Sequence, residues 1–170
     1  MKNRIDIMNQ IAMDTKKFRQ AMGRFATGVT VITTNTHDGV PTGMTCNSFA
    51  SVSLEPPLVL WSIARTSRNF VTFMAATNFA IHVLAEHQGE LCKQFSMREG
   101  DRFAGLQMAV GVTGVPLLTD CYARYECQTF ARYEAGDHVI VVGQVLAVAE
   151  QDGQPLLFHR GLFPKMVAGV

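Results

Sequence analysis

Short hydroxyl and amide side chains are concentrated in residues 43–58, which read GMTCNSFASVSLEPPL. Groups of this size form hydrogen bonds at close range, as a polyol chain or the polar edge of a planar ring requires. A second cluster, Ser67, Arg68 and Asn69, follows the apolar run 59–64. A cation and the backbone N–H groups of a starting helix could bind phosphate there. Together the two clusters indicate a planar ligand that carries a phosphate.

Each cluster also has a purely structural interpretation, because a Ser- and Thr-rich turn before an ordinary helix N-cap needs no ligand. Two other segments are candidate sites. The turn 136–138 (Gly-Asp-His) places an acid beside an imidazole, and residues 101–103 (Asp-Arg-Phe) place a cation beside an aromatic ring. Gly-Asp is equally good turn chemistry, and the second segment is a weak signal alone.

Several nucleotide, metal and hydrolase motifs are missing from the sequence. It has no Gly-x-Gly-x-x-Gly after a strand and no Gly-x-x-x-x-Gly-Lys-Ser/Thr, so a nucleotide would be bound without a Rossmann or P-loop unit. The five histidines are scattered and predict no metal site. Without a Gly-x-Ser-x-Gly elbow, we set hydrolysis aside.

Length and composition predict one protein domain over residues 14–170, after an N-terminal lead-in over residues 1–13. The net charge of +1 gives no reason to bind nucleic acid or an anionic membrane. Four cysteines without a Cys-x-x-Cys pair, and no leader or spanning segment, indicate a cytoplasmic protein with reduced thiols. The composition, 48% hydrophobic and 17% charged, favours a homo-oligomer.

Strands dominate the elements that would position these clusters. A first helix should begin at Asp14 or Thr15 and end near Gly28, with the apolar stripe Phe18, Ala21, Met22 and Phe25 in the core. Residues 97–115 should be loop. The other expected strands are at 29–34, from Val40 after a turn at 37–39, and at 57–64, 79–84, 124–133, 138–150 and 155–159. A short helix is expected within 66–77, with Ser67 near its cap, and a second one at 88–96. Successive hairpins favour an antiparallel barrel.

Five segments in order, 43–58, Ser67-Arg68, 101–103, 136–138 and 155–161 (PLLFHRG), resemble the flavin reductase-like family. The resemblance covers about residues 17–165. It implies a mainly β fold with flanking helices, an antiparallel six-stranded split β-barrel of the FMN-binding type, and a homodimer. It also implies an NAD(P)H:flavin oxidoreductase that transfers hydride from NADH or NADPH to FMN or FAD and supplies a partner monooxygenase with reduced flavin.

The resemblance also assigns residues to the two ligands. No catalytic acid or base is expected, because the cofactors carry the chemistry. One departure is His82, where many relatives have Asn; it could reshape a pocket, form a subunit contact or be a buried structural histidine. The expected nicotinamide nucleotide residues are Arg102, His138 and Arg160, and the expected flavin residues are Thr45, Cys46, Asn47, Ser48, Ser51, Val52, Ser53, Ala64, Ser67, Arg68 and Asn69.

Two other functions fit the same residues. The chain could be a flavin-binding protein or a split-barrel oxidase without nicotinamide activity, or a redox-sensing or structural dimer in which flavin is incidental. The choices between FMN and FAD, between NADH and NADPH, and between a tightly bound and a diffusible flavin stay open, as does the identity of any monooxygenase.

Overall fold

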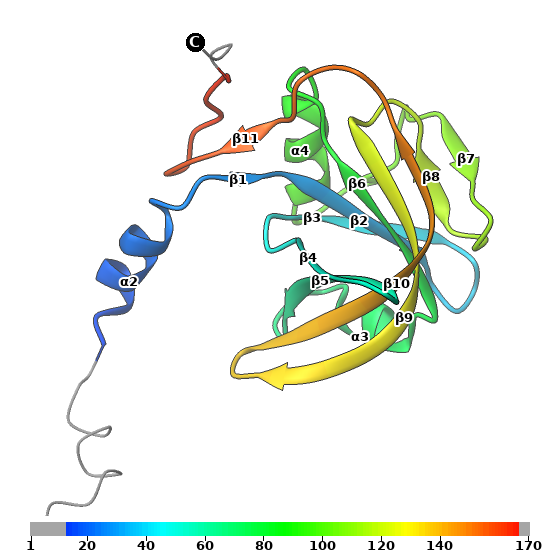
Figure 1. The fold of residues 1–170 in the computed structure, drawn as a ribbon, viewed down its shortest axis with the longest axis horizontal. Helices are drawn as coiled ribbons and strands as arrows, with labels where there is room; N and C mark the ends of the chain where they lie inside the picture. The colour runs from blue at the N-terminus through cyan, green and yellow to red at the C-terminus, as the bar shows by residue number, and fades with distance from the viewer. Residues whose placement is uncertain (1–12, 167–170) are drawn as a thin grey trace, which may run out of the picture.

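The computed structural model describes residues 13–166 and consists mainly of β-strands (Figure 1). Its main sheet is antiparallel, with the strand order β3-β2-β6-β9-β10-β5-β4. Two ribbons lie outside this sheet and pair β1 with β11 and β7 with β8. The strands are β1 Thr27–Gly28, β2 Thr30–Asn35, β3 Pro41–Cys46, β4 Ala50–Leu54, β5 Pro57–Ala64, β6 Asn78–Val83, β7 Met108–Val110, β8 Pro116–Leu118, β9 Ala123–Ala135, β10 His138–Glu150 and β11 Leu157–Phe158.

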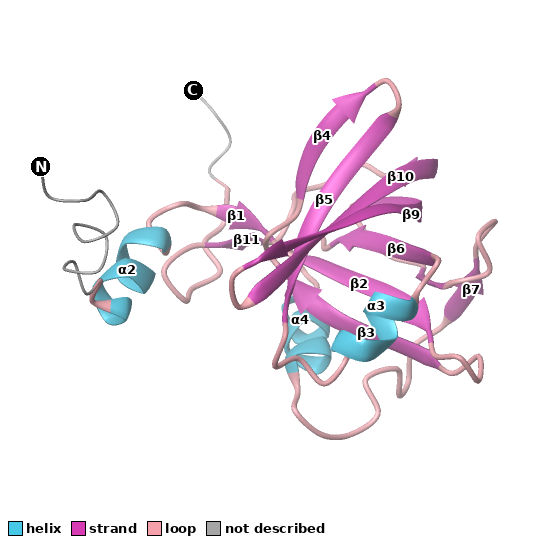
Figure 2. Cartoon of the chain, turned by 90° about the horizontal axis from the view of Figure 1, so that it is seen from below, coloured by secondary structure: helices cyan, strands magenta, loops and turns pink. Residues whose placement is uncertain are grey.

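In the described part of the chain three helices accompany the strands: α2 Thr15–Met22, α3 Phe70–Ala75 and α4 Gly89–Ser96. The helices α3 and α4 lie against the part of the sheet that contains β3, whereas α2 stands apart and joins the sheet through β1 (Figure 2). Within residues 13–166, no helix is both long and apolar enough to cross a membrane.

The core lies on both faces of the central strands. On one face Trp61 packs edge-on against Phe73 and Phe79, with ring centroids 5.0 and 5.8 Å apart. On the other face α4 packs against β3, where Phe95 is 1% exposed. A side chain at Gly43 would exclude this helix, because a Cβ there would lie 2.8 Å from the Phe95 ring. Strand β3 is therefore held tightly at the position where the first polar cluster begins.

Several expectations are confirmed, above all the mainly β, antiparallel architecture and the strand β5, which spans residues 57–64 as expected. The N-cap of α2 is Asp14, whose side chain accepts hydrogen bonds from the backbone N–H groups of Lys16 and Lys17. The expected lead-in over residues 1–13 lies almost wholly outside the described residues.

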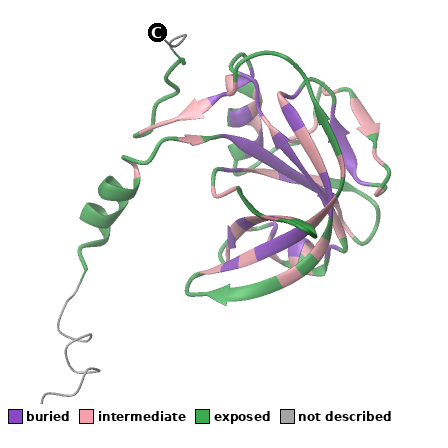
Figure 3. Cartoon of the chain, viewed as in Figure 1, coloured by how far each residue is buried: buried purple, intermediate pink, exposed green. Residues whose placement is uncertain are grey.

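The expectation for the first helix was wrong in two respects. The helix ends at Met22 rather than near Gly28, and its apolar stripe is not in the core, because α2 has no buried residue. Figure 3 shows α2 exposed along its length. The cause is position: α2 stands apart from the sheet, so its Phe18 and Met22 side chains have no core to join.

Other boundaries also differ from expectation. The main sheet has seven strands rather than six, because β4 adds an edge strand beside β5. Residues 97–115 are not all loop: β7 pairs with β8 around a turn closed by hydrogen bonds at Gly111 and Gly114. The expected strand 155–159 shrinks to Leu157–Phe158. The short helix expected within 66–77 is confirmed as Phe70–Ala75; its N-cap is Asn69, whose backbone N donates to the nearby Ser67 hydroxyl at 3.3 Å.

The buried histidine His82 has a structural role, one of the three interpretations open from the sequence. It is fully buried on β6, with its Nδ1 3.1 Å from the Val31 carbonyl oxygen and its Nε2 3.1 Å from the Leu118 backbone N. Because a carbonyl only accepts and an N–H only donates, the neutral Nδ1–H tautomer satisfies both partners. His82 therefore connects β6 to its neighbour β2 and to β8.

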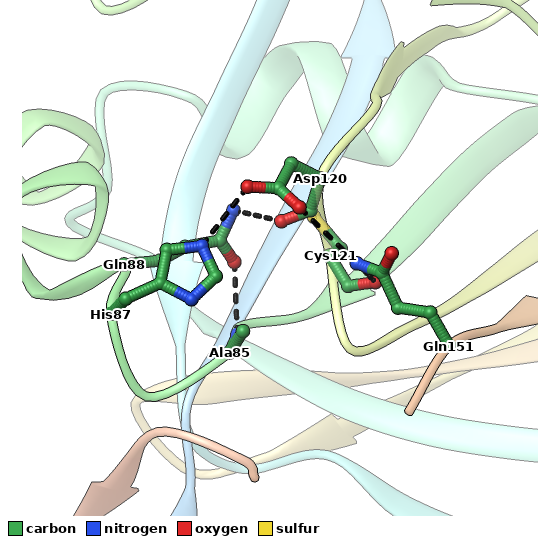
Figure 4. Close-up of polar contacts among 6 residues, drawn as sticks. All are labelled: Ala85, His87, Gln88, Asp120, Cys121 and Gln151. Atoms are coloured by element: carbon green, nitrogen blue, oxygen red, sulfur yellow. Dashed lines mark hydrogen bonds and ion pairs between the residues drawn. The ribbon is translucent and has the colours of Figure 1, made fainter. Parts of the chain in front are cut away.

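A polar cluster ties the β6–α4 turn to the start of β9 and the end of β10 (Figure 4). Gln88 accepts a hydrogen bond from the Ala85 backbone N (2.9 Å) and donates one to the Asp120 carbonyl. Gln151 donates to the Cys121 carbonyl at 2.6 Å, and His87 lies 3.0 Å from the Asp120 carboxylate. None of these residues is a predicted ligand-binding residue.

Replacing Gln88 with leucine should destabilise the fold by about 2 kcal/mol, because the buried Ala85 N–H and the Asp120 carbonyl would lose their partner. Urea denaturation measures this change. The matched control is His87→Ala, whose exposed contact with Asp120 should contribute less than about 1 kcal/mol. Equal losses in the two variants would contradict the structural role of Gln88.

Candidate functional site

Two neighbouring cavities contain most of the first polar cluster. The first, here the α2 cavity, has a volume of about 440 Å³; the second, the α4 cavity, has about 320 Å³. Both include Asn47 and Phe158, so they adjoin. The α2 cavity is lined by Met22, Gly23, Phe25, Thr27, Asn47, Ser48, Phe49, Ala50 and Phe158, and the α4 cavity by Val29, Thr45, Cys46, Asn47, Cys92, Lys93, Ser96, Phe158 and Phe163.

The hydroxyl groups of this cluster already hold the backbone in place. The Thr45 hydroxyl donates to the Cys92 carbonyl at 2.9 Å, which joins β3 to α4. The Ser48 hydroxyl accepts from the Ser62 backbone N at 2.9 Å and lies 3.0 Å from the Cys46 sulfur. Within residues 13–166, the exposed Asn47 side chain forms no hydrogen bond. Asn47 is therefore the polar side chain that both cavities offer to a ligand.

One buried polar atom in the α2 cavity has no partner. The Thr27 hydroxyl is shielded from solvent and has no hydrogen-bond partner among the described residues. Buried hydroxyl groups are nearly always paired, so an unpaired one in a cavity wall suits a ligand with polar atoms. The aromatic side chains Phe25, Phe49 and Phe158 surround the same space. This combination of flat apolar walls and a few polar groups fits a planar ring with polar edges.

Seven predicted flavin residues lie outside both cavities: Ala64 at the end of β5, the second cluster Ser67, Arg68 and Asn69, and three residues of β4. Ser51, Val52 and Ser53 are on the edge strand β4, where Ser51 pairs with Val59 and the Ser53 hydroxyl donates to the Glu55 carbonyl at 3.1 Å. Their role in ligand binding stays a prediction.

The second polar cluster is attached to the same strand as the first. The Asn69 amide donates to the Gly43 carbonyl at 3.0 Å, and the Ser67 hydroxyl lies 3.9 Å from the Met44 sulfur. Gly43 and Met44 directly precede Thr45 on β3. Because an extended strand rises about 3.3 Å per residue, the two clusters lie within about 10 Å of each other along β3. The structure thus brings together the two clusters that the sequence separates by about twenty residues.

Two arginines lie near the place where the second cluster meets β3, which we call the junction on β3, and they differ in their hydrogen bonding. The Arg102 guanidinium donates to the Gly43 carbonyl at 2.7 Å and, through two nitrogens, to the Met97 carbonyl. Burial, and secondarily the charge of Arg68, lowers the pKa of Arg102. Arg68 is exposed and has no hydrogen bond or ion pair within residues 13–166. Arg102 thus fastens the 97–103 loop to β3, and its predicted nucleotide contact remains untested, whereas Arg68 is available to an anion.

The turn 136–138 lies beside the second cluster. His138 pairs with Ala64, the last residue of β5, and the Arg65 backbone N donates to the Asp137 carbonyl at 2.9 Å. His138 Nδ1 lies 2.7 Å from the Asp137 carboxylate, and this hydrogen bond is the main cause of the lowered pKa of Asp137. In the neutral imidazole with a proton on Nδ1, Nε2 is left as an acceptor on a half-exposed ring.

The terminal motif meets the N-terminal helix rather than the turn 136–138. The Arg160 backbone N donates to the Gly23 carbonyl at 3.2 Å, and Phe158 pairs with Thr27. The sequence analysis did not predict that residues near the two termini would form walls of the α2 and α4 cavities. Met22, Phe25, Phe158 and Phe163 were assigned to the core or to no site, and the only signal available was the position of Phe158 in the terminal motif.

Burial disfavours the thiolate form of three of the four cysteines. Cys46, Cys92, Cys121 and Cys127 are free and buried. Burial is the main cause that raises the pKa of Cys92, and it raises the pKa of Cys121 and of Cys127 to about 12. A protonated thiol is a poor nucleophile, which disfavours a redox switch at these positions. Among residues 13–166, no group of three or more His, Cys, Asp or Glu side chains is placed to hold a metal ion.

Comparisons with known proteins agree with this geometry. The family described as "Flavin reductase like domain" matches residues 22–166. "FMN reductase (NADH) SmoA" of Agrobacterium fabrum is 50% identical over 150 residues, covering 88% of this chain and 85% of that protein. "Flavin-dependent monooxygenase, reductase subunit HsaB" of Rhodococcus jostii is 42% identical over 153 residues, covering 89% and 78%. The structure of Streptomyces globisporus NADH:FAD oxidoreductase SgcE6 with NAD and FAD fragments matches with a TM-score of 0.85 and 35% identity, covering 91% and 93%.

Proposed function

Because this chain belongs to the flavin reductase like domain family, we propose that it is an NAD(P)H:flavin oxidoreductase that transfers a hydride from NADH or NADPH to FMN or FAD. The observation that carries the proposal is the junction on β3. The two cavities adjoin one end of β3, and within residues 13–166 the Thr27 hydroxyl and the Asn47 amide in their walls have no hydrogen-bond partner. The Asn69 amide ties the Ser67–Asn69 cluster to the Gly43 carbonyl of the same strand.

The residues of this junction fit a flavin. Asn47 and Thr27 would bind the polar edge of its ring, and the aromatic walls Phe25, Phe49 and Phe158 would exclude water from its faces. Arg68 would bind the phosphate. The hydrogen bonds that fix Thr45 and Ser48 hold this frame in position before the ligand arrives.

The flavin, when bound, supplies the hydride acceptor, so the protein has to orient the donor rather than move a proton. His138 is suited to that task. Its Nε2 is a free acceptor for the amide N–H of a carboxamide, and the Asp137 carboxylate fixes the opposite side of the ring. No catalytic acid or base is required in this mechanism.

The test is oxidation of NADH or NADPH by the purified protein, followed by nucleotide absorbance with FMN, FAD or riboflavin added. Flavin-dependent oxidation is the expected result, and the relative rates rank both substrates. Flavin binding without oxidation of either nucleotide would contradict the proposal and indicate a flavin carrier or an oxidase.

Replacing His138 with alanine should raise the KM for the nicotinamide nucleotide about tenfold and leave the Kd for flavin unchanged, because one hydrogen bond to the nucleotide is lost. Steady-state kinetics and a flavin titration measure the two constants. The matched control is His37→Ala in the exposed turn after β2. An equal loss of flavin affinity would show that His138 does not act on the nucleotide.

A partner monooxygenase is part of the proposal. HsaB is named as the reductase subunit of a flavin-dependent monooxygenase, and it is 42% identical to this chain. The α2 cavity opens beside the exposed helix α2, so flavin would leave after reduction without unfolding the sheet. Reduced flavin would then act as a diffusible product for the oxygenase.

A cytoplasmic location also remains a prediction.

We also infer a homodimer. Phe130 on β9 and Leu146 and Val148 on β10 are each more than half exposed, although these two strands pair within the sheet. Leu54 on the edge strand β4 is 97% exposed. Large exposed apolar areas favour association. Light scattering should therefore give a mass about twice that of the 18.7 kDa chain. A monomer at micromolar concentration would contradict this inference.

A further inference from the structure

A third cavity has a strongly cationic lining. It has a volume of about 800 Å³ and lies between α2 and the turn that follows β11. Four of its nine lining residues are Lys or Arg, and none is acidic. We call it the cationic cavity; it is lined by Lys17, Arg19, Gln20, Ala21, Gly23, Arg24, Phe158, Arg160 and Gly161.

The backbone around the cationic cavity is well defined. The Arg160 N–H donates to the Gly23 carbonyl, and the β1–β11 ribbon pairs the adjoining residues. Arg160 has a φ of 52°, a left-handed conformation that is uncommon for a residue other than glycine. Non-glycine residues are held in this region only where the surrounding structure imposes it, often at ligand sites. The turn therefore fixes the backbone of Arg160 opposite the end of α2.

The four cations have no anionic partner among the described residues. Within residues 13–166, the side chains of Lys17, Arg19, Arg24 and Arg160 form no ion pair and no hydrogen bond. Like charges gathered around one cavity repel one another, and a multivalent anion would relieve that repulsion. Arginine is also the side chain best suited to bidentate contact with phosphate.

The cationic cavity adjoins the site already described. Phe158 lines the cationic, α2 and α4 cavities, and Gly23 lines the first two. Arg19 also lies near the turn 136–138, since its charge adds to the His138 hydrogen bond in lowering the pKa of Asp137. A ligand in the cationic cavity would therefore be within reach both of the flavin cavities and of the turn that carries His138.

We propose that the cationic cavity binds the phosphate groups of a dinucleotide whose reactive ring lies in the adjoining cavities. The proposal rests on the function proposed above and adds α2 to its substrate site. Two sources share this chemistry, the nicotinamide dinucleotide and the ADP half of FAD. Lys17 and Arg19 precede residue 22, where the match to the family begins. The other two cations, Arg24 and Arg160, lie within that match.

The test uses the double variant Lys17→Ala/Arg19→Ala with riboflavin, which has no phosphate, as the hydride acceptor. If the nicotinamide dinucleotide is the source, its KM should rise 10- to 100-fold, with kcat and the KM for riboflavin unchanged. If FAD is the source, the KM for FAD should rise instead and that for FMN should not. Either result supports the site, and unchanged constants for both dinucleotides would overturn it.

Two controls separate this proposal from its premise. Lys16→Ala removes a neighbouring exposed cation of α2 that does not line the cavity, and it should change no constant. Calorimetric titration with ADP needs no turnover. Binding of ADP to the wild-type protein that weakens at least tenfold in the double variant would support the site even if flavin reduction failed. No binding of ADP to the wild-type protein would overturn it.

Discussion

Acidification from pH 6.5 to pH 4 should lower the free energy of unfolding of this protein by about 3 kcal/mol through His82 alone. Burial lowers the pKa of His82 from 6.5 to about 4, with the charge of Arg124 acting in the same direction and the hydrogen bond to Val31 opposing both. In the unfolded chain the imidazole takes up a proton below pH 6.5, whereas in the folded protein it does so only below about pH 4. Lowering this pKa from 6.5 to about 4 corresponds to about 3 kcal/mol.

The stability that His82 contributes is therefore fully present above pH 6.5 and is lost as the pH falls toward 4. The exposed carboxylates of Asp120 and Asp137 affect stability only at lower pH, because hydrogen bonds with His87 and His138 lower their pKa values from 3.8. Urea denaturation of the ligand-free protein at several pH values measures the dependence.

His82→Asn is the variant that tests the assignment. An amide does not titrate, and the Asn side chain can still donate to the Val31 carbonyl, although the Leu118 N–H loses its acceptor. The variant should be less stable at pH 7 by about 1–3 kcal/mol, with the loss between pH 6.5 and 4 largely removed. His37→Asn, in an exposed turn, should retain that loss. A slope that is the same in the wild type and in His82→Asn would assign the acid sensitivity to other groups.

The sequence predicted correctly those strands and helices whose hydrophobic pattern and flanking turn residues are both distinctive. The strand Pro57–Ala64 alternates buried and partly exposed residues and is bounded by a proline pair and a polar turn, so its limits were visible. The hairpin of β7 and β8 was not visible, because Gly111 and Gly114 indicate loop as well as turn. The apolar stripe of α2 was misassigned because burial depends on which element a helix meets, and the period of a helix does not contain that information.

The candidate site also has a part that the sequence predicted and a part that it did not. Its polar members Thr45 to Ser48 are contiguous in the sequence and could be recognised together. Its walls come largely from residues 22–27 and 158–163, which the β1–β11 pairing and the hydrogen bond from Arg160 N to the Gly23 carbonyl bring to the same place. Likewise, nothing in the sequence indicates that Arg102 binds two backbone carbonyls while Arg68 binds none. Such differences between two arginines depend on contacts between distant residues.

Replacing Arg68 with alanine should weaken FMN binding 10- to 100-fold. The exposed Arg68 guanidinium lies close enough to Arg102 to lower the pKa of that group, after the larger effect of burial. Arg102 is already bound to the Gly43 and Met97 carbonyls, so Arg68 is the member of the pair that can turn toward a phosphate. A charge-assisted hydrogen bond to phosphate contributes about 1–3 kcal/mol, and about 1.4 kcal/mol corresponds to each factor of ten.

Riboflavin separates the phosphate contact from the rest of the site, because it shares the ring and the polyol chain of FMN and lacks only the phosphate. Fluorescence titration of Arg68→Ala should show a weaker Kd for FMN and an unchanged Kd for riboflavin. Arg98→Ala, in the exposed segment after α4, is the matched control and should change neither. Equal loss of both ligands in Arg68→Ala would mean that Arg68 supports the fold of the junction on β3, and the phosphate would have to be bound elsewhere.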